Sequence, residues 1–131
     1  MRRVVTAFRS DTRGSSMVEF ALTLPLFGAL LFGAVESGLM LWTQLGLQHG
    51  VEQAARCATV NTTTCGTESA VQAYAVSAAY GLSVPPETFA LASAACGNEV
   101  TATYSYQFLT GRLVFGNGSS VGLTARSCFP K

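Results

Sequence analysis

The sequence predicts an α+β protein with a long N-terminal helix, a second short helix and a three-stranded antiparallel sheet. Three observations predict this class. An apolar run of 23 residues continues into a segment whose apolar side chains recur at helical spacing. A later segment alternates apolar and polar residues, as a strand with one buried face does. All four cysteines follow the apolar run, where they can stabilise a small outer domain.

The apolar run extends from Phe20 to Trp42, and its only charged residue is Glu36. As a helix it would be about 35 Å long, enough to cross a hydrocarbon core of about 30 Å. A cleaved secretory signal is shorter and ends at a small-residue cleavage site. The nearest candidate, Val35-Glu36-Ser37, has a charge at its centre. The run therefore predicts a single-pass membrane anchor.

The charges are distributed unevenly on the two sides of this run. Residues 1–14 hold four arginines and one aspartate, whereas residues 15–131 hold four basic residues and six glutamates. Since cytoplasmic flanks carry the excess of basic residues, we expect a cytoplasmic N-terminus and an outer C-terminal domain. The net charge of the chain is +1, which predicts no basic surface for nucleic acid. The lipid bilayer is thus an expected partner.

Glu36 stands inside this apolar run. A carboxylate at mid-bilayer costs about 2.5–3.5 kcal/mol on insertion scales, so it is a candidate for a polar contact within the membrane. The alternative is solvation at the outer interface, because Trp42 follows only six residues later. The sequence leaves both interpretations open.

Apolar residues keep their helical spacing beyond Trp42, so we expect one helix over residues 15–58. Its inner part would face lipid and its outer part would be amphipathic. Residues 59–131 are expected to form a small, disulfide-stapled outer domain. Thr67 and Glu68 can begin a second helix that ends at Gly81.

The cysteines are Cys57, Cys65, Cys96 and Cys128. An even number outside the cytoplasm predicts two disulfides, and the spacings match no common zinc motif, so no metal site is expected. Three pairings are conceivable. We favour one bond closing the loop after the long helix, Cys57–Cys65, and one tying the sheet, Cys96–Cys128.

Strands are predicted over residues 87–96, 99–109 and 119–128. In an antiparallel meander the end of the third strand returns to the start of the second, which places Cys128 near Glu99 and supports its pairing with Cys96. Between the second and third strands, Arg112-Leu113-Val114-Phe115 is interpreted as an extension of the hairpin buried on the sheet. The alternative is an exposed apolar contact for a partner subunit.

The chain offers no pattern for catalysis. It has one histidine, no acidic cluster and no glycine-rich phosphate loop. We therefore expect no enzyme activity and no cofactor.

The segment RGSSMVEFALTLPLFGALLFGAVESGLMLWTQ resembles the N-terminus of TadE-like proteins, the pseudopilins or minor pilins of the bacterial tight-adherence (Flp-type) pilus system. The shared features are a basic leader, Arg-Gly before small residues, Val-Glu-Phe-Ala, a Leu-Pro and a Glu-Ser-Gly where the family often has Glu-Phe-Gly. Ala-Ala-Arg near the helix end also matches. The resemblance covers about residues 10–58.

The resemblance implies that residues 1–14 are a leader, which a membrane prepilin peptidase removes between Gly14 and Ser15. Glu19 would then be the fifth mature residue. Its carboxylate could pair with the new α-amine, of its own or a neighbouring subunit, and set the register of packed helices. The implied partners are this peptidase, other pilins or pseudopilins and the pilus-assembly proteins of the inner membrane.

The resemblance places the protein in the bacterial inner membrane, with its C-terminal domain in the periplasm. It implies a pseudopilin that helps to assemble or prime a tight-adherence pilus, and it leaves open whether the protein enters the filament. The alternative is a signal-anchored extracytoplasmic binding or adhesion module that is never processed.

Overall fold

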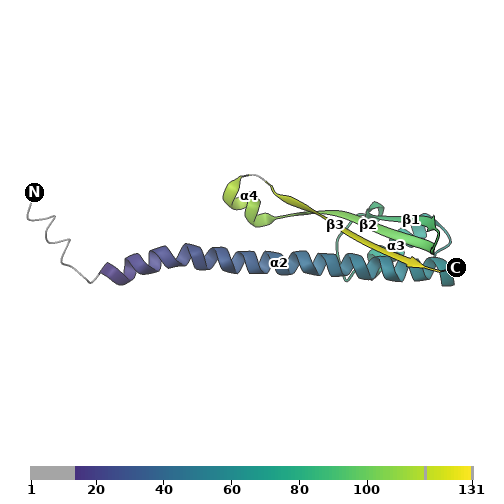
Figure 1. The fold of residues 1–131 in the computed structure, drawn as a ribbon, viewed down its shortest axis with the longest axis horizontal. Coiled ribbons are helices and arrows are strands. Elements are labelled where there is room, and N and C mark those ends of the chain that lie inside the picture. The colour runs from purple at the N-terminus through teal and green to yellow at the C-terminus, as the bar shows by residue number, and fades with distance from the viewer. Residues whose placement is uncertain (1–13, 117, 131) are drawn as a thin grey trace, which may run out of the picture. The chain divides into compact units, whose positions relative to one another are not determined.

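The computed structural model describes residues 14–116 and 118–130. The elements in chain order are α2 (Ser15–Val60), α3 (Glu68–Ala78), the 3₁₀ turn η2 (Pro86–Thr88), β1 (Phe89–Ala94), β2 (Gly97–Gln107), α4 (Leu109–Phe115) and β3 (Ser120–Phe129) (Figure 1). The long helix, the shorter second helix and the three-stranded antiparallel sheet confirm the predicted α+β class. Of the expected leader, residues 1–13 lie outside the described part of the chain.

The chain divides into two compact units, and the division falls within α2, between Val35 and Glu36. In the first unit every residue from Ser16 to Val35 is exposed except Gly28, although most of them are apolar. Within the described residues, α2 is the one helix that is long and apolar enough to cross a membrane. Such a surface requires an apolar environment in place of water.

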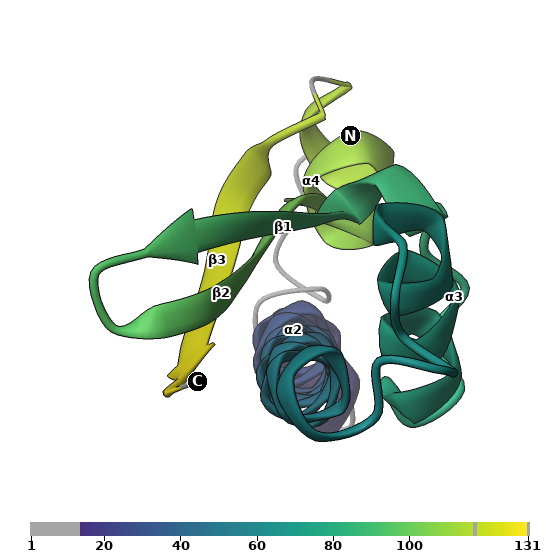
Figure 2. The same ribbon diagram turned by 90° about the vertical axis from the view of Figure 1, so that its right-hand side faces the viewer.

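The outer part of α2 is amphipathic, as predicted. Its buried side chains recur every three or four residues: Leu47, Val51, Ala54, Ala55 and Ala58. Leu45 is an exception, with 62% of its surface exposed. Figure 2 looks along α2 and shows the sheet on one side of the helix and α3 on another. The buried stripe of α2 therefore packs against both the sheet and α3.

Two glycines bring α2 close to α3. A Cβ atom at Gly50 would lie 3.0 Å from the carbonyl oxygen of Ala75 and 3.2 Å from the ring of Phe89. At Gly46, one turn earlier, it would lie 3.0 Å from the carbonyl oxygen of Ala79. This Gly-xxx-Gly spacing was not recognised from the sequence, and it permits an approach that larger residues would prevent.

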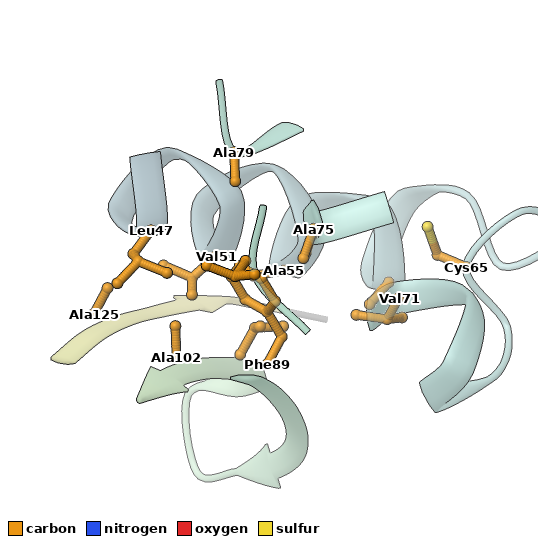
Figure 3. Packing of buried hydrophobic residues seen from close by; sticks show 14 of the residues in the cluster. Leu47, Val51, Ala55, Cys65, Val71, Ala75, Ala79, Phe89, Ala102 and Ala125 are labelled. Carbon is orange, nitrogen blue, oxygen red and sulfur yellow. The ribbon is translucent and has the colours of Figure 1, made fainter. Parts of the chain in front are cut away.

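The sheet has the order β1-β2-β3 with both neighbouring pairs antiparallel. Glu99 lies opposite Cys128, as the predicted meander requires. The core includes Phe89, Val100 and Ala102, all of which are fully buried. Figure 3 shows Phe89 and Ala102 facing Leu47 and Val51 of α2. The alternating pattern of β2 thus places its apolar face on the helices, as expected.

The C-terminal end of α2 and the ends of the three strands differ by one or two residues from the predicted ones, and two differences have a clear cause in the backbone. Helix α3 ends at Ala78 and not at Gly81, because the chain turns through Tyr80 and Gly81, which both have positive φ. The hairpin turn between β1 and β2 consists of Ala95 and Cys96, so Gly97 begins β2 instead of separating the strands. Gly97 has a φ of 131°, a backbone conformation that side chains disfavour.

The interpretation of residues 112–115 as a hairpin extension is wrong. The chain leaves the sheet after Gln107 and forms helix α4 from Leu109, which ends at Gly116 in a left-handed conformation. The N–H of Phe108 donates to the carbonyl of Ser119 at 3.0 Å and closes the base of this excursion. The sequence pattern did not predict α4, because the hydrogen-bond acceptor for its first turn is Glu36, which belongs to α2.

Candidate functional site

The expected processing boundary coincides with the start of α2. Gly14 is exposed, and no heavy atom lies within 4 Å of a Cβ built on it. The helix begins at Ser15, so Glu19 lies in the second turn, where its side chain is exposed. No hydrogen bond or ion pair joins the Glu19 carboxylate to another described residue. Gly14 is therefore exposed, and the Glu19 carboxylate has no partner among the described residues.

Glu36 is only 8% exposed, and its carboxylate binds the beginning of α4. One oxygen, Oε1, accepts the N–H of Leu109, and both oxygens accept the N–H of Thr110 at 3.2 Å. These donors belong to the first turn of α4, whose N–H groups have no acceptor within the helix. A negative charge at a helix N-terminus also interacts favourably with the helix dipole. Glu36 therefore fixes α4 to α2.

Two aromatic rings lie beside this contact. Tyr106 and Phe108 pack edge to face, with ring centroids 5.4 Å apart. Burial raises the pKa of the Tyr106 hydroxyl, and the nearby charges of Glu36 and Tyr104 raise it further. At neutral pH Tyr106 is thus a neutral neighbour of the Glu36 carboxylate, and Glu36 has its hydrogen bonds to α4 as compensation for burial.

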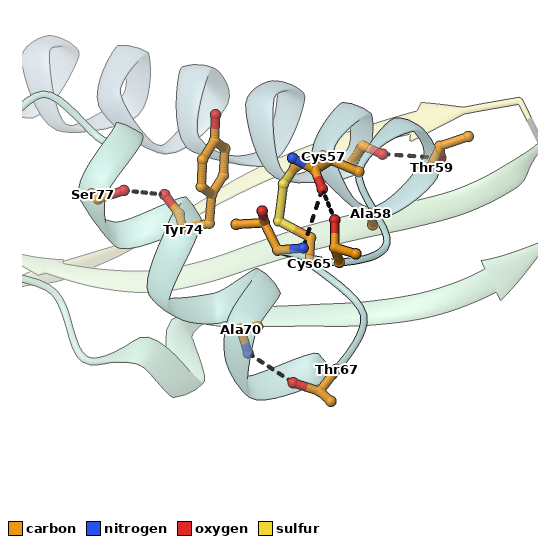
Figure 4. The surroundings of a disulfide bond; sticks show 12 residues. Cys57, Ala58, Thr59, Cys65, Thr67, Ala70, Tyr74 and Ser77 are labelled. Carbon is orange, nitrogen blue, oxygen red and sulfur yellow. Dashed lines mark hydrogen bonds between the residues drawn. A yellow bond between two sulfur atoms is a disulfide. The ribbon is translucent and has the colours of Figure 1, made fainter.

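The four cysteines form two disulfides, with the pairing favoured from the sequence. Cys57–Cys65 joins the last turns of α2 to the segment before α3, with Cα atoms 5.7 Å apart (Figure 4). In the same region Thr67 caps α3 by accepting the N–H of Ala70 at 3.3 Å, as predicted. The bond therefore fixes where the second helix begins relative to the end of the first.

Cys96–Cys128 joins the β1–β2 turn to the end of β3, with Cα atoms 6.2 Å apart. Glu99 lies near the two sulfur atoms, a grouping that can resemble a metal site. The sulfur atoms are bonded to each other and are not thiolates, however, and the Glu99 carboxylate is 3.2 Å from Nε of Arg126. The grouping is therefore accounted for without a metal.

A pocket of about 290 Å³ lies beside the first disulfide. Its lining includes Arg56, Asn61 and Tyr74 together with Cys57. Arg56 is exposed, so the pocket offers one cation at its rim and no carboxylate.

Several polar side chains, for which the sequence predicted no specific contact, tie α2 to its neighbours through backbone groups. The amide of Gln44 donates to the carbonyl of Thr124 in β3 at 2.9 Å. Asn98 donates to the carbonyl of Ala58 at 3.0 Å, and His49 donates to that of Ala78 at 2.8 Å through Nδ1. Each is a polar residue beside an apolar stripe, which is a weak signal because most such residues are simply solvated.

The structure thus separates the expected site residues into three places. Gly14, Ser15 and Glu19 belong to the first compact unit, whereas Glu36 and the cysteines belong to the second. Within the second unit, Glu36 lies at the beginning of its helical segment, and the cysteines lie near the other end of that segment or on the sheet. No common catalytic centre joins these places in the described residues.

The described residues thus combine a candidate membrane-spanning helix with a small disulfide-bonded α+β unit. Comparison with known families gives a match for the helix. Residues 14–56, about a third of the chain, match the family model described as TadE-like protein, which confirms the resemblance expected from the sequence. No curated protein and no solved structure matches the chain. The match covers α2 almost to its end and includes Gly14, Ser15, Glu19 and Glu36.

Proposed function

We propose that the protein is a pseudopilin, or minor pilin, that helps to assemble or prime a tight-adherence pilus in the bacterial inner membrane. The observation that carries this proposal is the TadE-like match to residues 14–56, on a helix that begins directly after the expected cleavage site. The exposed apolar surface of residues 16–35 supports it, because that surface needs lipid or neighbouring helices around it.

The geometry at the helix start is compatible with peptidase processing. Cleavage after Gly14 would leave the amine of Ser15 one helical turn from Glu19. Residues four apart lie on the same face of a helix, so this amine, or that of a neighbouring subunit, can reach the carboxylate. An ion pair in a low dielectric would favour one axial register between packed helices.

The role that we propose is one of insertion and assembly, without catalysis or a cofactor. The functional groups that the described residues present, Glu19 and Glu36, are single carboxylates on different compact units. Their proposed uses are binding and positioning. The proposed partners are the prepilin peptidase, other pilins or pseudopilins, and pilus-assembly proteins of the inner membrane.

Processing is the direct test of this function. In a host with an active prepilin peptidase, mass spectrometry of the wild-type protein should show the loss of residues 1–14. A Gly14→Val variant should keep the leader, because the peptidase would no longer accept the residue before the cleaved bond. Gly28→Val is the matched control on the same exposed helix, and it should be processed normally.

An intact N-terminus in the wild-type protein would contradict the proposal. That outcome would favour the other candidate, a signal-anchored extracytoplasmic binding module that is not processed. Normal processing of Gly14→Val, with a cut at the same bond, would remove Gly14 from the recognition site.

A further inference from the structure

Helix α4 is held at a defined height along α2. The N–H groups of Leu109 and Thr110 donate to the carboxylate of Glu36, 73 and 74 residues earlier in the chain. The first turn of α4 therefore lies at the level of Glu36, whatever the tilt of α2.

This level lies within the apolar run of the sequence. Glu36 is six residues before Trp42, which is about 9 Å along a helix. Tryptophan prefers the membrane interface, a zone of about 5–8 Å on each side of the hydrocarbon core. If Trp42 occupies that zone, Glu36 and the start of α4 lie near the outer boundary of the hydrocarbon.

The contact between Glu36 and α4 suits that environment. An amide without an acceptor and an unpaired carboxylate are both costly where water is scarce. Here the carboxylate accepts two amide donors, so each group offsets the cost of the other. In bulk water the same groups would be solvated without any partner.

Apolar side chains are exposed at the start of α4 and in the turns of α2 that follow Glu36. Leu109 is 65% exposed, Trp42 55% and Leu39 50%, although all three belong to the compact outer unit. The ring of Tyr80 lies 6.1 Å from that of Trp42 and adds a second aromatic residue of the kind found at interfaces. Arg112 in α4 is exposed and can reach anionic headgroups.

We infer that α4 is a second membrane contact, which lies at the boundary between the headgroups and the acyl chains of the outer leaflet and is held there by Glu36. The inference rests on the proposed anchoring of α2 in the bilayer. Lipid is favoured over a second copy of the chain because Glu36, Leu39 and Trp42 belong to the apolar run of the sequence that is expected to enter the bilayer. At that depth, association of two copies would gain no hydrophobic free energy over contact with lipid.

Fluorescence quenching by brominated lipids tests this placement in the full chain. Trp42 is the only tryptophan, so the wild-type protein reports on the anchor itself. The α4 probe is Leu109→Trp in a Trp42→Phe background, reconstituted in vesicles of phosphatidylcholine and phosphatidylglycerol. Arg112→Trp is a second probe in case the first variant does not fold. Thr103→Trp, on the exposed polar face of β2, is the matched control, and all three probes are made in the Trp42→Phe background.

Brominated acyl chains should quench the wild-type protein and both α4 probes, but should not quench the Thr103→Trp control. Adding Glu36→Ala should reduce the quenching of the Leu109→Trp probe, because α4 would then no longer be held at this depth.

Quenching of the wild-type protein without quenching of the α4 probes would overturn the inference and leave the anchor intact. Absence of quenching in all proteins would contradict the anchor itself. Shielding of the α4 probes from aqueous acrylamide without quenching by lipid would show that a second protein surface covers α4, which also overturns the inference.

Discussion

The first turn of α4 depends on the side chain of Glu36. We expect Glu36→Ala to leave the N–H groups of Leu109 and Thr110 without their acceptor, at a cost of about 1–3 kcal/mol. Hydrogen exchange of these two amides in the detergent-solubilised protein should accelerate accordingly. Glu36→Gln keeps an acceptor oxygen and should have a smaller effect.

Glu87→Ala is a suitable control for this experiment, because Glu87 is an exposed carboxylate on η2. It should leave the exchange of the α4 amides unchanged. If Glu36→Ala also left it unchanged, the carboxylate would not hold α4 in solution.

Glu19 has a different expected role, because its side chain is exposed and has no partner among the described residues. Glu19→Ala should spare the removal of the leader and reduce the number of pili, since packed helices would lose an ion pair that sets their register. Glu19→Gln should have the same effect, because it removes the charge and keeps the size. Mass spectrometry measures the processing and electron microscopy counts the pili; normal piliation in both variants would exclude the register role.

At the scale of elements, the packing of α2 on α3 depends on small residues. Gly50→Ala should destabilise the protein, because its Cβ would meet the carbonyl oxygen of Ala75 and the ring of Phe89. Overpacking costs about 1–3 kcal/mol, whereas replacing a helix glycine by alanine gains about 1 kcal/mol. Gly38→Ala is the control, because nothing lies within 4 Å of its Cβ.

Thermal unfolding in detergent measures both glycine variants. The melting temperature should fall for Gly50→Ala and should stay equal or rise for Gly38→Ala. A rise in the melting temperature of both variants would mean that α2 and α3 can move apart without loss of stability.

Periodicity was sufficient to predict the regular elements, because their side chains are buried on one face. The apolar positions that alternate in β2, and those at helical spacing around Leu47 and Val51, are the positions that are buried. Helix α4 shows no such periodicity in the sequence, because it has only seven residues and one of them is Gly111. Its start depends on an acceptor 73 residues away, which no local pattern contains.

The candidate sites, too, could be predicted from the sequence only where local residues indicate them. Glu36 was recognised from its cost in an apolar run, but its partner could not be found without the fold. Gly14 and Glu19 were identified through the resemblance of the sequence to a family. The close approach at Gly46 and Gly50 was missed, although glycines four apart on a helix are a known signal of tight packing.

At the scale of the whole molecule, two disulfides stabilise a unit with a small core. Their sequence separations are 8 and 32 residues. In the loop-entropy model, closing these loops contributes about 2.5 and about 3.7 kcal/mol respectively. Replacing Cys96 and Cys128 together by serine should therefore cost more than replacing Cys57 and Cys65.

Denaturant unfolding of the two double variants under non-reducing conditions compares these costs. The paired serines in each variant avoid a free thiol that could exchange with the remaining disulfide. A larger loss for the Cys57/Cys65 pair would show that the folded state of the helix junction, and not loop entropy, dominates.

The two cross-links also determine how the chain would carry mechanical tension. Force applied between α2 and the C-terminus would pass from Cys57 directly to Cys65, and later from Cys96 directly to Cys128. The backbone between the members of each pair would be bypassed. That bypassed backbone includes all of β2 and α4 and nearly all of β3, so a pull on the ends could not peel these two strands apart.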